Sequence, residues 1–174
     1  MVLDTGWLDL GTFASNAFGG GGTAWSNPSN AASSDDADAA SALINFLDTS
    51  EWLVATNPNP SIPDKHVITG VEIRNETAVT NTNVDWQLSQ LVYSGALYGS
   101  PKTNTNVVTT VDTVFEDGGP ADLWGAILTP DIVNDTSFGF AVRYINTDIT
   151  FAGTATVDHL QIKLSYRRRR IIIC

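Results

Sequence analysis

The regular alternation of apolar and polar residues between Thr154 and Tyr166 is the feature that most constrains this chain. Four apolar residues of the segment share one face: Leu160, Ile162, Leu164 and Tyr166. The residues between them are polar or charged. A two-residue period of this length predicts a strand with one buried face and one face in water.

A second segment, residues 138–144, alternates in the same way and precedes the first in the chain. The polar residues 146–153 lie between the two segments. This arrangement predicts an antiparallel hairpin, and we place that hairpin at the centre of the sheet.

Other segments show strand-like alternation or β-branched and aromatic content: 7–13, 51–56, 66–74, 84–93, 107–115 and 123–128. Residues 39–47 stay open between a short helix, which their alanines favour, and a strand. Turns or loops are expected at 81–83, 95–106 and 116–120. Thr129, Pro130 and Asp131 form a helix-start signature, which predicts one short helix near 130–134.

Together these elements predict an all-β fold, an antiparallel β-sandwich for which a jelly roll fits the strand count best. The 174 residues suit one domain. We divide the chain into residues 1–22, an N-terminal arm or first strand with a glycine-rich loop, and residues 23–166, the sandwich. Residues 167–174 form a basic and apolar C-terminal arm beyond it.

The motifs of catalysis and cofactor binding are missing from the sequence. Gly19 to Gly22 are followed by Thr23-Ala24-Trp25 and not by the Lys-Ser/Thr pair of a phosphate-binding loop. No His-Glu-x-x-His, cysteine cluster or Gly-x-Ser-x-Gly is present. We therefore expect no catalytic residues, no cofactor and no enzymatic activity.

An acidic turn at Asp35, Asp36 and Asp38 has oxygen ligands close enough together to suit Ca²⁺. The glycine and distal glutamate of a calcium-binding loop are absent, so a solvated turn without metal is the expected reading.

The net charge of −10 argues against a body that binds nucleic acid or an anionic membrane. A single cysteine rules out an internal disulfide framework. The first residues show no basic region followed by an apolar run, and no run approaches the roughly 20 residues of a membrane span. We expect synthesis in a cytoplasm, which is compatible with export as part of a larger particle.

Several phrases, taken in order from Trp25 to Tyr166, resemble a β-sandwich domain that recurs in structural proteins of tailed-phage virions. The phrases are Ala24-Trp25-Ser26-Asn27-Pro28, Leu53-Val54-Ala55-Thr56, Ile68-Thr69-Gly70-Val71, Gly118-Gly119-Pro120-Ala121-Asp122-Leu123-Trp124-Gly125, Thr129-Pro130-Asp131-Ile132, Phe138-Gly139-Phe140 and Thr156-Val157-Asp158-His159. The chain departs from the pattern at Asn57-Pro58-Asn59-Pro60. The resemblance implies a β-sandwich with a structural or attachment role and no chemistry.

We therefore expect a non-enzymatic virion structural protein, most simply a capsid decoration, cement or head-fibre component. Its partners would be the major capsid protein, other virion proteins and further copies of itself, with a trimer expected by analogy with phage decoration proteins. A carbohydrate-binding module of a tail fibre or spike, which would bind a cell-surface glycan, and a neck or collar protein stay open as alternatives.

Partner contacts are expected from two tryptophans in irregular segments, Trp7 and Trp25. Trp86 and Trp124 are expected in the core. The C-terminal arm supplies the other contact residues: Arg167, Arg168, Arg169, Arg170, Ile171, Ile172, Ile173 and Cys174. Adjacent arginines favour an acidic partner, and the isoleucines favour strand addition to a neighbour's sheet, with Cys174 buried or disulfide-linked to another chain.

Overall fold

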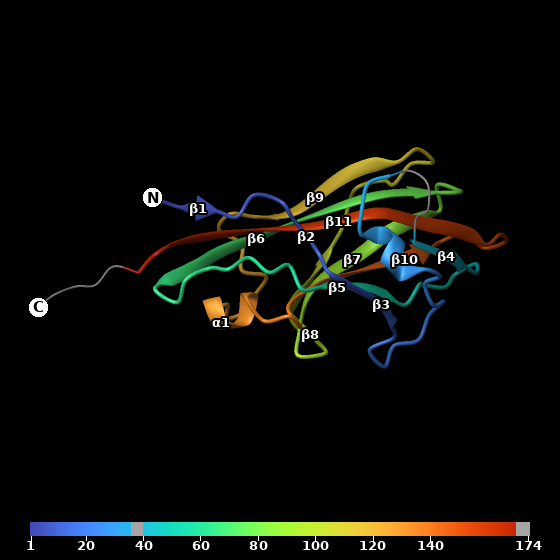
Figure 1. Ribbon diagram of the computed structural model, residues 1–174. Helices are drawn as coiled ribbons and strands as arrows, with labels where there is room; N and C mark the ends of the chain where they lie inside the picture. The colour runs from blue at the N-terminus through green and yellow to red at the C-terminus, as the bar shows by residue number, and fades with distance from the viewer. Residues whose placement is uncertain (36–39, 170–174) are drawn as a thin grey trace, which may run out of the picture.

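The protein is described by a computed structural model that covers residues 1–35 and 40–169. Two antiparallel sheets lie face to face along one long axis (Figure 1). Sheet A consists of β1 (Leu3–Asp4), β2 (Leu8–Asp9), β4 (Ala40–Ile44), β6 (His66–Val79), β9 (Thr113–Gly119) and β11 (Gly153–Arg168). Sheet B consists of β3 (Thr12–Asn16), β5 (Trp52–Thr56), β7 (Val84–Tyr93), β8 (Ala96–Thr103) and β10 (Gly139–Asn146).

The order of the strands confirms the predicted sandwich and its jelly-roll character. The eight strands from β4 to β11 are arranged as β4-β11-β6-β9 in sheet A and β5-β10-β7-β8 in sheet B. Successive strands of this set alternate between the sheets, except for the hairpin β7–β8. Such alternation gives the double Greek key of a jelly roll.

The prediction that residues 138–144 and 154–166 form a central hairpin is wrong, because these two segments belong to different sheets. β10 pairs with β5 and β7 in sheet B, whereas β11 pairs with β6 in sheet A. The loop between them therefore carries the chain from one sheet to the other. Alternation in sequence tells which face of a strand is buried, but it does not tell which strand lies beside it.

Two strand boundaries near the middle of the chain also differ from the prediction. Residues 107–112 lie outside any strand, and β9 continues through residues 116–119, where a turn was expected. Residues 96–103, expected as a loop, form β8 as the hairpin partner of β7. Pairing along a long neighbouring strand overrides the weak local preference of these glycine- and proline-containing segments.

The apolar segment 123–128 is not a strand, although its composition predicts one. Trp124 and Gly125 have φ angles of 56° and 65°, which are incompatible with extended pairing. The turn buries the Trp124 ring to 2% exposure, and its Nε1 donates to the Val71 carbonyl oxygen at 3.0 Å. Burial of one large ring decides the backbone conformation here.

The short helix is confirmed as α1 (Pro130–Val133), where the Thr129 side chain accepts from the Ile132 amide. A 3₁₀ turn, η1 (Pro28–Ala31), lies near the start of the domain. The open choice for residues 39–47 resolves to a strand, β4, which pairs with β11.

The core between the sheets contains a buried polar network around Tyr144. The Tyr144 hydroxyl donates to Thr77 Oγ1 at 2.8 Å and accepts from Asn75 Nδ2 at 2.8 Å. Thr77 Oγ1 in turn donates to the Thr156 carbonyl oxygen at 2.6 Å. Burial raises the pKa of Tyr144 well above its ordinary value, against the opposing effect of the hydrogen bonds with Thr77 and Asn75. These bonds tie β6, β10 and β11 together across the interior.

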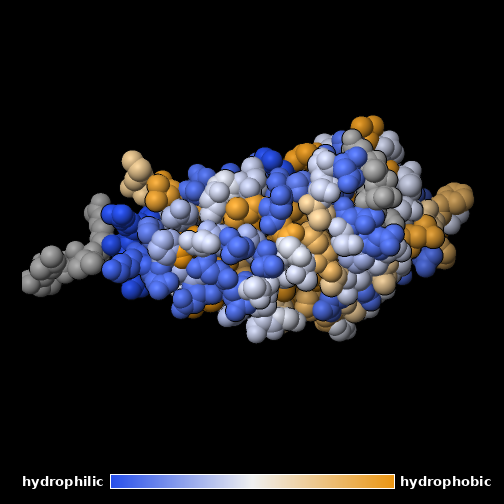
Figure 2. All heavy atoms as spheres, viewed as in Figure 1, coloured by the Kyte–Doolittle hydropathy of each residue, from blue (hydrophilic) through white to orange (hydrophobic). Residues whose placement is uncertain are grey.

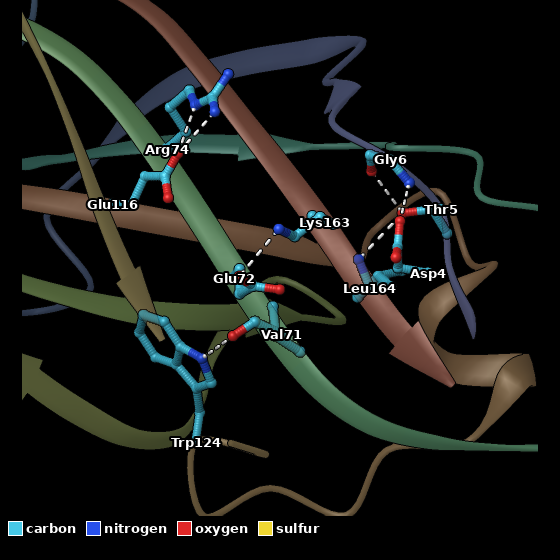
Figure 3. A network of polar contacts seen from close by, with 10 residues as sticks. All are labelled: Asp4, Thr5, Gly6, Val71, Glu72, Arg74, Glu116, Trp124, Lys163 and Leu164. Carbon is cyan, nitrogen blue, oxygen red and sulfur yellow. Dashed lines mark hydrogen bonds and ion pairs between the residues drawn. The ribbon is translucent and has the colours of Figure 1, made fainter. Parts of the chain in front are cut away.

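The N-terminal segment is incorporated into the sandwich. β1 and β2 pair with β11 of sheet A, and β3 pairs with β5 of sheet B. Figure 3 shows Thr5 beside β11, where its Oγ1 accepts from the Leu164 amide at 3.1 Å and donates to the Gly6 carbonyl oxygen at 2.7 Å. The first 16 residues thus lie along one edge of each sheet, on β11 in sheet A and on β5 in sheet B.

Candidate protein-binding surface at the C-terminal end

One end of the sandwich gathers cations from two strands that are far apart in sequence. The last residues of β11 pair with the first residues of β6, so that Arg167 lies opposite Val67 and Arg168 opposite His66. The Arg169 amide continues this contact by donating to the Lys65 carbonyl oxygen at 2.9 Å. We call Lys65, Arg167, Arg168 and Arg169 the basic end; it lies where the chain runs toward its C-terminus (Figure 1).

The loop before β6 shapes this end. The His66 ring packs edge-on against Tyr166, with centroids 5.3 Å apart, and its Nδ1 lies 3.1 Å from the Pro63 carbonyl oxygen. An open hollow of about 920 Å³ lies here. Its lining consists of Pro63, Asp64, Lys65, His66, Arg168 and Arg169. The lining combines the cationic side chains of Lys65, Arg168 and Arg169 and the imidazole of His66 with the carboxylate of Asp64.

Three of the four Lys and Arg residues in the body of the sandwich are matched by acids of the same chain. The three ion pairs are Arg74 with Glu116 at 2.6 Å, Lys102 with Asp122 at 2.5 Å, and Lys163 with Glu72 at 3.0 Å. Figure 3 shows Arg74 of β6 paired with Glu116 of β9, and Lys163 of β11 paired with Glu72 of β6. A fourth, Arg143, donates to the Thr49 hydroxyl.

One of these acids, Asp122, is favoured in its ionised form. Burial alone would raise the pKa of Asp122, but hydrogen bonds from Lys102 and from the Trp124 amide keep that pKa below its usual value.

The cations of the basic end differ from those of the body: within residues 1–35 and 40–169, none of the four makes an ion pair. The basic end therefore presents unmatched positive charge on a chain whose net charge is −10.

The two tryptophans expected at partner contacts have partners inside this chain. The half-buried Trp7 ring lies against two cations, 4.1 Å from Arg74 Cζ and 4.6 Å from Lys163 Nζ. Trp25 is only 5% exposed; its Nε1 donates to the Glu51 carbonyl oxygen, and its ring meets Tyr144 edge-on at 5.6 Å. Trp25 thus has little surface to offer another molecule.

The other tryptophans lie in the interior. Trp86 and Trp124 are buried, as predicted, and so is Trp52. Buried rings cannot stack on a sugar, so these three provide no carbohydrate platform.

The expected anchoring residues of the C-terminal arm fall into two groups. Arg167, Arg168 and Arg169 belong to the basic end, whereas Arg170, Ile171, Ile172, Ile173 and Cys174 lie outside the described residues. Sequence reasoning missed Lys65, although a cation directly before a strand could have been noticed. Only the antiparallel register of β6 and β11 brings it beside the arginines.

The acidic turn that could supply oxygen ligands to Ca²⁺ lies only partly within the described residues. Asp36 and Asp38 of the acidic turn lie outside the described part, and Asp35 donates its amide to Asp158 Oδ2 at 3.1 Å. Across the described ranges, no three His, Cys, Asp or Glu residues cluster to hold a metal ion. Those ranges likewise contain no helix of the length and apolarity needed to cross a membrane.

Comparison with known proteins adds no identification: no family model matches this chain, and no curated protein sequence matches it significantly. Function must therefore be argued from the residues and their arrangement.

Proposed function

We propose that this chain is a non-enzymatic structural protein of a tailed-phage particle, a capsid decoration, cement or head-fibre component that is held by its basic end. The sequence resemblance described above motivates the particle. One observation carries the mode of attachment: Lys65 and Arg167 to Arg169 make no ion pair within the described chain, while three of the four cations in the body do.

Four cations at one end repel one another, and an acidic partner surface would relieve this repulsion. β11, a strand of 16 residues, runs the length of the sandwich and ends there, so any extension of the chain leaves the body at this point. An acidic patch on a neighbouring virion subunit is the surface that such an end fits.

The test is incorporation into particles. We would change Arg167, Arg168 and Arg169 to Gln in cells where the variant is the sole source of this protein, and count copies per purified particle by quantitative mass spectrometry. We expect incorporation to fall at least tenfold at physiological salt, and the incorporation of the unchanged protein to weaken as salt rises. Deletion of residues 167–174 should have at least the same effect.

A matched control carries the same change of charge in the body, with Arg74, Lys102 and Lys163 changed to Gln. It should be less stable but still incorporated. Equal loss in both variants would contradict a specific basic end, and absence of the unchanged protein from purified particles would contradict the virion role.

A further inference from the structure

The end of the sandwich opposite the basic end exposes large apolar side chains. They come from β4, the loop after it, and the loop between β10 and β11. The exposed fractions are 59% for Leu43, 55% for Phe46, 67% for Leu47, 77% for Ile149 and 67% for Phe151. We call these five residues the apolar tip. Figure 2 shows hydrophobic surface at this end, whereas the other end is largely hydrophilic and carries a smaller apolar group. The exposed Met1, Val2 and Leu3 lie at that other end, where β1 pairs with the last residues of β11.

The two loops of the apolar tip are held in place by hydrogen bonds. The Leu47 amide donates to the Asp148 carbonyl oxygen at 3.0 Å, and the Asn146 amide donates to the Asp48 carbonyl oxygen at 2.9 Å. The buried Asn146 side chain donates to the carbonyl oxygens of Ile44 and Phe151 at 3.1 and 2.9 Å. The apolar side chains are therefore presented on a braced support, as a preformed binding surface requires.

Both described loops of the apolar tip carry a carboxylate, Asp48 in one and Asp148 in the other, and residues 40–56 and 144–153 contain no Lys or Arg. The nearby Arg143 is engaged by the Thr49 hydroxyl. Hydrogen bonds from the amides of Thr150 and Phe151 hold the pKa of Asp148 below its usual value. A partner segment for this surface would combine positive charge with apolar side chains.

The C-terminal segment of this chain has that combination, with Arg167 to Arg170 followed by Ile171 to Ile173. It cannot reach the apolar tip of its own molecule. β11 has 16 residues and separates the two ends by about 50 Å. The six residues after Arg168 span at most about 20 Å when fully extended. A segment that occupies the tip must come from another copy.

β4 offers a backbone site beside the apolar tip. It pairs with β11 on one side, and the described residues supply no strand on its other side. Leu43 points outward from this edge strand, between the buried Ala42 and Ile44. An extended segment rich in isoleucine can add to such an edge and place alternate side chains on the apolar surface.

We propose that the C-terminal segment of one copy docks on the apolar tip and the β4 edge of the next copy, head to tail. The isoleucines cover the apolar side chains, and the arginines face the carboxylates of the two loops. The contact is heterologous, so it closes into a ring or continues as a chain of copies. The inference deepens the proposed function, because it names another copy as the partner of the basic end, but it applies to purified protein without any particle.

Sedimentation velocity on purified protein tests this contact with two complementary variants. One ends after Arg170 and keeps the tip; the other carries Ile149→Ser and Phe151→Ser and keeps the C-terminal segment. The full chain should self-associate, more weakly at high salt, and each variant should associate at least about tenfold more weakly. An equimolar mixture of the two variants should form a one-to-one pair, since one supplies the tip and the other the segment.

A matched control and a second tip variant keep the result interpretable. The control is Ile127→Ser, which changes an isoleucine that is 80% exposed. Ile127 lies far from the apolar tip, because its neighbour Leu128 lines a hollow with Arg169 at the basic end. This variant should associate like the full chain. Phe46→Ser with Leu47→Ser should repeat the loss through the other loop. A monomeric full chain at all concentrations would overturn the proposal. So would variants that fail to pair, or an association abolished by a reducing agent, which would indicate a disulfide between two Cys174 residues.

Discussion

The middle of the sandwich and its two ends follow opposite rules. In the middle, polar groups find partners within the chain: Tyr144 bonds to Asn75 and Thr77, and Lys163 pairs with Glu72. At the ends, positive charge and apolar surface are left without such partners in the described residues. Contacts in the middle therefore stabilise one molecule, whereas the ends present charge and apolar surface that contacts with other molecules can use.

The largest expected difference between the two regions comes from a pair of phenylalanines. Phe140 is fully buried between the sheets, and Phe151 is 67% exposed at the apolar tip. Phe140→Ala should lower the free energy of unfolding by about 3–5 kcal/mol, because it removes apolar contacts and leaves a cavity. Phe151→Ala should change it by less than about 0.5 kcal/mol. Urea unfolding measures the change in free energy for each variant. Similar losses in the two variants would contradict the assignment of Phe140 to the core and of Phe151 to an exposed surface.

A smaller effect is expected from the buried hydroxyl of Tyr144. Tyr144→Phe leaves Asn75 and Thr77 without this partner and should cost about 1–3 kcal/mol at pH 7. Thr109→Val is a control, since its hydroxyl bonds only to neighbours in an exposed turn. Urea unfolding of the two variants at pH 7 should separate them clearly.

The same hydroxyl makes a prediction for alkaline pH. Its pKa is raised in the folded protein, so above the ordinary value of 10.0 the unfolded chain loses this proton while the folded chain keeps it. The contribution to stability is complete below pH 10 and declines above it, by about 1.4 kcal/mol for each pH unit. Between pH 9 and pH 11.5, the free energy of unfolding should fall more steeply with pH for the unchanged protein than for Tyr144→Phe. Parallel curves would contradict the buried, protonated phenol.

The smallest effect on stability is expected at the basic end. Changing Arg167, Arg168 and Arg169 to Gln removes no ion pair found among the described residues. The free energy of unfolding should stay within about 0.5 kcal/mol or rise slightly, because repulsion between the arginines is relieved. A loss of more than 1 kcal/mol would show that these arginines support the fold itself, and would weaken their assignment to docking.

Features that depend on nearby residues were predictable from the sequence. Alternation defined β6, β7, β10 and β11, since a two-residue period directly reports a strand with one buried face. The Thr129-Pro130 start of α1 was predictable because helix capping involves only a few neighbouring residues. The charge of the C-terminal arm, and hence three of the four residues of the basic end, also came from the sequence.

The tertiary structure decided which strands are neighbours and what lies exposed. β10 and β11 lie in different sheets. The sequence could not predict this, because a two-residue period identifies the buried face of a strand but does not identify the strand that pairs with it. Apolar Phe46, Leu47, Ile149 and Phe151 look in sequence like core residues, yet the loops that carry them lie beyond the ends of the sheets. Lys65 joins the arginines only through the register of β6 with β11. Local sequence sets the conformation of strongly patterned segments such as β6 and β11, whereas weakly patterned segments such as β8, and the surroundings of every segment, depend on contacts between residues far apart in the chain.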